Sequence, residues 1–279
     1  LELFQGASSF NQDISDWDVS SVYNMNNMFL NANGLSDENK CAIHLSFSSN
    51  DAWPYDWYGL CVFTPITQDN IHEAVDLWVS NQAEAEVTYG HISYWDVSNV
   101  MDMSELFYNA QSFDSDISSW NVSNVTNMAS MFRWANVFNG DLSSWDVSSV
   151  TDMSFMFEMS ENGLFNSNIS SWDVSSVTNM NGMLTRNVNF NHDISSWDVS
   201  NVTNMHAMFW RCYSFNQDLS NWDVSSVTDM QAMFAETNNL SDENKCAIHL
   251  SFSSNDAWPY DWYEFCDFTP ITQDNIQEA

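Results

Sequence analysis

Four cysteines form two equally spaced pairs, and thiols in such an arrangement either crosslink a chain or bind a metal ion. Cys41 and Cys61 are 20 residues apart, and Cys246 and Cys266 repeat that spacing. Each pair is predicted to form a disulfide that closes a loop and stabilises the fold by roughly 3 kcal/mol. The alternative is zinc, because a Cys-x-x-His sequence adds a histidine such as His44. Such a set supplies only three ligands, which favours the disulfides.

Aspartate recurs at one position of a repeated Trp-Asp-Val-Ser motif. Equivalent residues of adjacent parallel chain segments lie about 4.8 Å apart, where two full charges repel by ~1 kcal/mol in water. Such a row of carboxylates is a candidate cation ladder, because Ca²⁺ binds carboxylates and carbonyls. The alternative is turn capping, in which each Asp accepts backbone N–H bonds. The column comprises Asp18, Asp96, Asp146, Asp173, Asp198 and Asp223, with Asn121 substituting once.

A second acidic column precedes the tryptophan of each repeat. Its spacing to the following serine favours turn capping over metal binding. The sequence contains no glycine-bearing calcium loop of a known kind. No metal site is therefore assigned, and Ca²⁺ is the one cofactor kept as a hypothesis. The column comprises Asp13, Asp116, Asp141, Asp193 and Asp218, with Asn168 substituting once.

Other residues with reactive side chains fit structural roles. Cys212 stands alone at a position where other repeats have a small residue, so a buried inert thiol is expected. No nucleophile elbow, phosphate-binding glycine loop or nucleotide fingerprint occurs, and the chain is predicted not to be an enzyme. A methionine column is expected to lie in the core; it comprises Met103, Met128, Met153, Met180, Met205 and Met230.

The elements that position these residues belong to a short repeat. Trp95, Trp120, Trp145, Trp172, Trp197 and Trp222 are spaced 25, 25, 27, 25 and 25 residues apart. Trp17 anchors a seventh copy, and the longer interval accommodates a small loop at 160–164. Each copy is too short to bury its own apolar residues, so neighbouring copies must stack.

A longer repeat has a period of 205 residues: 35–58 recur unchanged at 240–263. The chain is therefore interpreted as a slice of a tandem array. Six segments are predicted: the last repeat of a preceding module (1–33), a closing cap with a Cys pair (34–63), a helical leading segment of the next module (64–90), six 25-residue repeats (91–238), a second closing cap with a Cys pair (239–268) and the start of a further module (269–279).

The repeat pattern predicts the fold class. Alternating burial places Trp197 and Val199 inward and Asp198 outward on a short strand. Helical spacing places Met205 and Phe209 on one face of a short helix or 3₁₀ turn. The predicted fold is a repeat solenoid, similar to leucine-rich repeats, with short parallel strands, short helices or 3₁₀ turns, and small helical disulfide-bearing caps.

The unit F-N-x-D-[IL]-S-x-W-D-V-S-x-V-T-[ND]-M-x-x-M-F resembles that of the BspA-like leucine-rich-repeat surface proteins. The resemblance covers residues 1–33 and about 91–238 and leaves the caps and the leading segment unexplained. It implies cell-surface display, adhesion and partner binding, and it implies no catalytic site.

Composition narrows the partners. The 279 residues carry 38 Asp plus Glu against 5 Lys plus Arg, a formal net charge of −33. This charge disfavours nucleic acid and anionic membranes, while 44% hydrophobic residues suffice for a core. No apolar run is long enough to span a bilayer, and paired cysteines predict an extracellular location.

Three functions follow as hypotheses. The first is an extracellular structural or adhesive protein whose modules join head to tail in a surface filament or stalk. The second is a binding module whose acidic face, formed by Ser196, Asp198, Ser200 and their equivalents, holds a basic protein or a cation-bridged glycan. The third and weakest is a surface that orders water or ice.

Overall fold

The computed structural model describes residues 2–160 and 162–266, and the predicted start of a further module at 269–279 lies outside this range. The chain divides into two compact units. One comprises Leu1–Ile66 and Asp76–Trp95, and the other comprises Thr67–Val75 and Asp96–Ala279. Each unit contains stacked coils and one copy of the closing cap, so each is described by itself.

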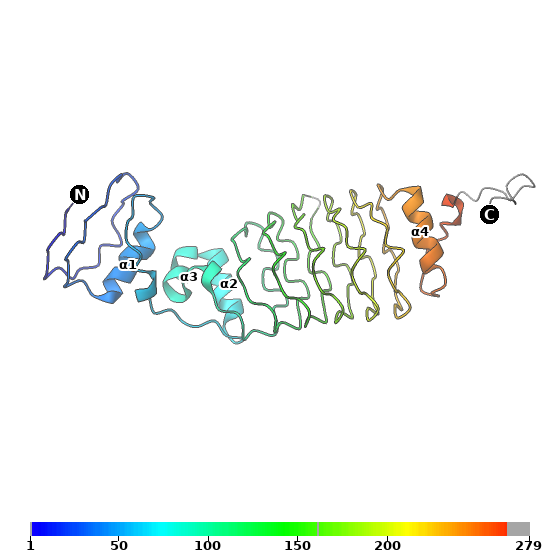
Figure 1. The fold of residues 1–279 in the computed structure, drawn as a ribbon, viewed down its shortest axis with the longest axis horizontal. Coiled ribbons are helices and arrows are strands. Elements are labelled where there is room, and N and C mark those ends of the chain that lie inside the picture. Colours follow the sequence, from blue (N-terminus) through cyan, green and yellow to red (C-terminus); the bar gives the residue numbers. More distant parts are fainter. Residues whose placement is uncertain (1, 161, 267–279) are drawn as a thin grey trace, which may run out of the picture. The chain divides into compact units, whose positions relative to one another are not determined.

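Within the described residues, α-helices occur only in the caps and the leading segment. Ser36 caps the first helix by accepting a hydrogen bond from the Asn39 N–H at 3.2 Å. Ser241 caps the identical helix of the second copy. The α-helices are α1 (Asp37–Phe47), α2 (Ile71–Ser80), α3 (Gln82–Tyr89) and α4 (Asp242–Phe252), and the 3₁₀ turns are η1 (Tyr58–Leu60), η2 (Ile92–Tyr94) and η3 (Tyr263–Phe265) (Figure 1).

The predicted leucine-rich-repeat solenoid with parallel strands is wrong. Over the described residues, the coils contain no strand and no α-helix, and Met208 and Phe209 lie on turns instead. Parallel pairing is limited to isolated bridges between equivalent residues of neighbouring coils. These bridges join, in chain order, Asp102, Asn127, Asp152, Asn179, Asn204 and Asp229.

Side-chain turns explain why strands do not form. Asp193 accepts the N–H of Ser195 at 2.9 Å, and Asp198 accepts the N–H of Ser200 at 3.1 Å. Asn204, in the bridge column, accepts the N–H of the second residue after it at 2.9 Å. Each such bond bends the backbone locally. Three bends within one coil leave no extended stretch long enough for a strand.

The coils are joined mainly through the segment that begins with the repeated pattern Met-x-x-Met-Phe, in which Leu106 and Leu184 are the exceptions. In one coil, the N–H groups of Met205, Ala207, Phe209 and Arg211 donate to the next coil at 2.8–3.0 Å. The third residue of the segment is left-handed in each coil, and the seventh is left-handed in most coils, with φ of 52° at Ala207 and 60° at Arg211. We call this segment the ribbon. It covers residues 103–109, 128–134, 153–159, 180–186, 205–211 and 230–236.

Identical side chains stack from coil to coil in the core. Trp197 and Val199 are buried while Asp198 is exposed, which confirms the predicted alternation without a strand. The indole N–H groups of Trp145, Trp172, Trp197 and Trp222 also bond to the preceding coil, as Trp172 does to the Leu142 carbonyl at 3.0 Å. Figure 1 shows the coils of the second unit side by side up to α4.

Candidate functional site

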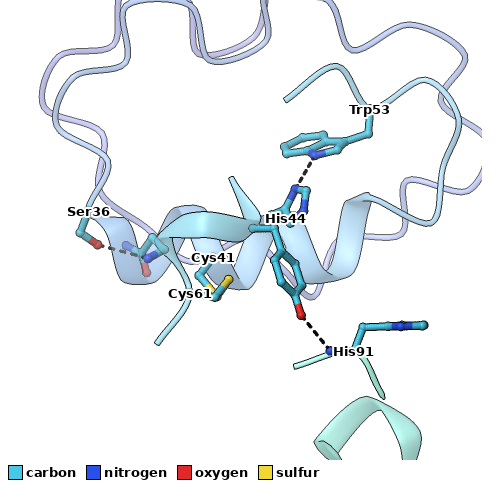
Figure 2. The surroundings of a disulfide bond; sticks show 8 residues. Ser36, Cys41, His44, Trp53, Cys61 and His91 are labelled. Carbon is cyan, nitrogen blue, oxygen red and sulfur yellow. Dashed lines mark hydrogen bonds between the residues drawn. A yellow bond between two sulfur atoms is a disulfide. The ribbon is translucent and has the colours of Figure 1, made fainter. Parts of the chain in front are cut away.

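Both predicted disulfides are present in the structure. Cys41 in α1 bonds to Cys61, and Cys246 in α4 bonds to Cys266, each with Cα atoms 5.0 Å apart. Figure 2 shows the first bond fixing the chain after Tyr58 against α1. Because the four thiols are oxidised, they are not zinc ligands, and His44 has a different partner: its Nδ1 accepts the Trp53 indole N–H at 2.9 Å.

Each closing cap covers the exposed end of a coil stack. The Asn50 side chain donates to the carbonyls of Val19 and Val22 at 2.7 and 2.9 Å, and Tyr55 Oη accepts the N–H of Phe29. Asn255 makes the two equivalent bonds in the second unit at the same distances. These contacts satisfy backbone groups that no further coil covers, and open edges of this kind otherwise promote association.

The first cap also packs on the leading segment, within one compact unit. Tyr58 Oη accepts the backbone N–H of His91 at 3.1 Å (Figure 2), and its ring lies 5.1 Å from that of Tyr94. Gly90 ends α3 with φ of 78°, and a Cβ atom there would lie 2.7 Å from Tyr58 Oη. We call this contact the joint, because it connects the end of one predicted module to the beginning of the next.

A cavity of about 480 Å³ lies in the joint. Its lining includes His44 and Asp56 from the cap and Glu86 and His91 from the leading segment. Burial lowers the pKa of His44, so its imidazole is neutral near pH 7. The cavity thus combines a neutral histidine with carboxylates from both sides of the joint.

The other end of the second unit's stack is covered by a residue of the leading segment. Gln68 accepts the N–H groups of Met101 and Asp102, each at 2.9 Å, and donates to the Asp102 carbonyl at 2.9 Å. Gln68 thus pairs with the backbone of Asp102, the first residue in the series of isolated parallel bridges. The stack in this unit is therefore closed at both ends.

The Asp columns act as turn caps. Wherever a hydrogen bond is assigned to an Asp side chain of either column, the carboxylate accepts the N–H of the serine two residues further along the chain. Asp18 does so at 3.0 Å and Asp141 at 2.9 Å. Among the described residues, no group of three or more His, Cys, Asp or Glu side chains is arranged to hold a metal ion. Calcium binding by the ladder stays a prediction, and an unchanged melting temperature with added calcium and with chelator would contradict it.

The capping bonds predict a loss of stability in acid. The hydroxyl and N–H of Ser200 lower the pKa of Asp198 below its usual 3.8, and serines act likewise on Asp173 and Asp223. A carboxyl whose pKa falls on folding contributes stability above its unfolded pKa, and that stability is lost as pH falls through its folded pKa. The melting temperature should therefore decrease as the pH is lowered below about 4.

Asparagine provides the matched control for this acid effect. Asn121 occupies the Asp column naturally and accepts the Ser123 N–H at 3.2 Å. Replacing Asp173, Asp198 and Asp223 together by Asn should keep the turns and reduce the acid dependence of the melting temperature. An acid dependence equal to that of the unmodified chain would show that these carboxylates are not responsible.

The remaining predicted residues lie in the core. Cys212 is fully buried, its Sγ lies 2.9 Å from the Leu184 carbonyl oxygen, and burial raises the pKa of its thiol far above the usual value. The six methionines of the predicted column are also fully buried. None of these groups is exposed to a ligand, as the sequence interpretation expected.

Sequence reasoning missed the arginines. Arg133, Arg186 and Arg211 all lie on the ribbon, and they are the only arginines of the chain. Beside them is a groove of about 450 Å³. A signal for them exists in the sequence: a few ribbon positions vary from coil to coil while most other positions repeat. A search for repeating residues does not detect such variable positions.

The structure is that of a repeat protein with capped stacks of coils and small disulfide-linked helical segments. The chain belongs to the family described as Mycoplasma protein of unknown function, DUF285, which matches residues 1–44, 78–163 and 159–246. No curated protein matches the chain, and no solved structure does. Membership is compatible with a surface protein, whereas the narrower resemblance to BspA-like leucine-rich repeats is not confirmed.

Two findings bear on location. No helix among the described residues is long and apolar enough to cross a membrane. The two disulfides are consistent with an oxidising, extracellular compartment, since disulfides persist there and are rare in the cytosol.

Proposed function

We propose that the chain is part of a non-enzymatic structural and adhesive protein of the cell surface, in which 205-residue modules follow one another head to tail. The joint carries this proposal. A cap that ends one coil stack also contacts, through Tyr58, the segment that leads into the next stack. The neighbouring module of the same protein is thus the partner for which the chain has a built contact.

Duplication supports the same conclusion. Residues 35–58 and 240–263 are identical, and both copies dock on a coil through the same set of hydrogen bonds. A cap that only had to end a stack would need the docking residues alone. Identity throughout the segment, including Tyr58 and Tyr263 on η1 and η3, favours a second function in joining modules.

The surface chemistry supports a structural role at the cell exterior. The net charge of −33 keeps such a chain soluble and discourages lateral association. The acidic columns are almost identical from coil to coil, which suits a repeated scaffold better than the recognition of one ligand. We therefore place the structural function in the stacks and caps.

The proposal predicts that the protein is exposed on intact cells. Antibodies raised against the purified chain should label unpermeabilised source cells, and treatment of the intact cells with proteinase K should remove the label. Fab fragments of the same antibodies should reduce attachment of these cells to a surface they colonise. Fab fragments against a cytosolic protein of the same cells are the control. Label that appears only after permeabilisation would refute surface display, and attachment unaffected by bound Fab would refute the adhesive role.

A further inference from the structure

Variation between the coils is concentrated on the ribbon. The Trp-Asp-Val-Ser part of the coil barely changes, whereas the two positions after Met-x-x-Met-Phe differ between neighbouring coils at every step except from Arg186 to Arg211. A constant scaffold with one variable surface is the arrangement by which stacked repeats form binding faces. The first variable position holds Tyr108, Arg133, Glu158, Thr185, Trp210 and Ala235, and the second holds Asn109, Trp134, Met159, Arg186, Arg211 and Glu236.

The ribbon carries all three arginines of a strongly acidic chain, together with three glutamates, Glu105, Glu158 and Glu236. Arg211 pairs with Glu236 of the next coil at 2.9 Å, and Arg133 pairs with Glu158 at 2.7 Å. Arg186 occupies the same column as Arg211, one coil earlier, and has no carboxylate within 4.0 Å in the part of the chain that the structure describes. The hydrogen bond from Arg211 and the charges of Arg211 and Arg186 lower the pKa of Glu236.

Aromatic rings accompany these arginines. The guanidinium carbons of Arg186 and Arg211 lie 5.0 and 4.9 Å from the centre of the Trp210 ring, and Arg133 lies 4.8 Å from the Phe155 ring. Trp210 and Phe155 also line the groove of about 450 Å³. The groove thus has apolar walls, and the guanidinium of Arg186 beside Trp210 is not paired with a carboxylate of the described residues. This combination suits a ligand with an apolar face and one anionic group.

The polar groups of the groove complete its chemistry. The Arg133–Glu158 pair, of which Glu158 is buried and Arg133 half-buried, and the side chain of Asn181 lie in its lining. Asn181 Oδ1 is buried and has no hydrogen-bond partner among the described residues. A buried acceptor without a donor costs about 1–3 kcal/mol. A ligand hydroxyl is the kind of donor that would satisfy it.

Backbone conformation indicates that these residues were not selected for the fold. Phe155 and Arg186 have φ of 55° and 61°, in the left-handed region that disfavours residues with large side chains. The first coil has Asn27 and Asn31 at the equivalent positions, and asparagine tolerates this region better. Retaining bulky residues at a conformational cost points to function, as strained residues at binding sites do.

We propose that this groove binds a glycan through a sugar ring that carries one carboxylate, as in a uronic or a sialic acid. The ring packs against Trp210, the carboxylate pairs with Arg186, and ring hydroxyls donate to Asn181 Oδ1. A polyanion or an acidic protein is disfavoured, because its further charges meet the repulsion of the chain's net −33. This inference goes beyond the structural function and does not depend on it.

Titration of the purified chain by saturation-transfer NMR tests the inference. The probes are 3′-sialyllactose, a glucuronic-acid-containing disaccharide and lactose as the neutral comparator. At least one acidic sugar should bind with a Kd on the order of 1 mM or lower, at least tenfold tighter than lactose. The two acidic probes distinguish the source of the carboxylate, and binding of either one supports the proposal.

Variants taken from the chain's own repeat identify the residues. Arg186→Asn installs the residue found at Asn31 and Asn109 with nearly the same φ, so the fold should be kept while the preference for the acidic sugar falls about tenfold. Trp210→Ala, matching Ala235, should weaken both acidic and neutral sugars. Lys245→Gln removes the same charge from α4 and should change nothing.

Several outcomes overturn the proposal. These are equal binding of acidic and neutral sugars, no saturable binding of either acidic probe up to about 10 mM, and tighter binding of a Glu-rich peptide than of the sugars. Equal loss of binding in Arg186→Asn and Lys245→Gln also overturns it, because the effect then reflects net charge alone. None of these results bears on surface display of the array.

Discussion

Replacing Phe157 by alanine is expected to lower the free energy of unfolding by about 3–5 kcal/mol, a typical cost of removing a buried phenyl ring. Phe157 is fully buried in the middle of the second unit's stack. Its ring stacks on Phe132 of the preceding coil at 5.5 Å and on Phe165 of the following coil at 3.8 Å. The substitution therefore leaves a cavity lined by side chains of both neighbouring coils.

The control for this substitution is present in the chain. Leu184 fills the same position one coil later and is also fully buried. Phe157→Leu should thus cost less than about 1.5 kcal/mol, since it retains most of the apolar volume. Urea unfolding followed by tryptophan fluorescence measures both variants. A cost for alanine no larger than that for leucine would mean that the coils collapse around the missing ring and are less tightly packed than the structure indicates.

The position of the loss is informative as well. Stacked repeats are stabilised mainly by contacts between nearest neighbours. If the coils unfold as one cooperative unit, Phe157→Ala shifts a single transition. If the central coils separate, hydrogen exchange should rise in 128–186 before it rises near the closing cap at α4.

The periodic pattern of the sequence predicted which side chains are buried but not the backbone that buries them. Alternation along Trp197, Asp198 and Val199 is the same in a strand and in the observed turn-rich coil. What decides between them is the Asp-x-Ser bond, seen at Asp198 and Ser200, which bends the backbone before a strand can extend. The acidic columns therefore distinguish the two backbone conformations: because their Asp side chains cap turns, the coils form no strands.

The helical prediction for Met205 to Phe209 failed for a related reason. Met208 and Phe209 are buried as the spacing requires, but Ala207 is left-handed and its N–H donates to the next coil at 2.9 Å. Bonds between coils thus replace bonds within a helix. A pattern search along one coil does not register this choice, because the competing partner lies 24 residues further along the chain.

The caps were predictable in detail, whereas the arginine groove was not. Ser36, Cys41 and Cys61 have local or pairwise roles that residue type and spacing define. The groove is formed by Arg133, Trp210 and other residues that share no motif and differ from coil to coil. Only the stacking of the coils brings such residues together, so recognising the groove required the structure.

Loss of the Cys246–Cys266 disulfide is expected to destabilise the second closing cap by about 3 kcal/mol, because the bond closes a loop with a sequence separation of 20. The change is the double substitution Cys246→Ser and Cys266→Ser. It should release the chain after η3 from α4 and weaken docking of the cap through Asn255, whose side chain bonds to Val224 and Val227. Hydrogen exchange should then increase first in 222–260.

A buried cysteine outside the caps provides the control. Cys212 is a free thiol in a coil, and Cys212→Ala reproduces the residue found at Ala110 and Ala135. This variant should melt within a few degrees of the unmodified chain, since it removes one small buried group. A reductant should lower the melting temperature of the unmodified chain and of Cys212→Ala alike, by an amount larger than the effect of Cys212→Ala itself.

The comparison also tests how the cap works. If the cap mainly shields the coil edge, its release should raise the exchange of the Val224 and Val227 region and leave the distant coils near 103–109 protected. If the melting temperature and exchange of the double-serine variant equal those of the unmodified chain, the hydrogen bonds of Asn255 and Tyr260 hold the cap without the crosslink. The equilibrium stability of the cap would then not depend on the disulfide. The function of the disulfide would instead be to resist mechanical or proteolytic opening of the cap.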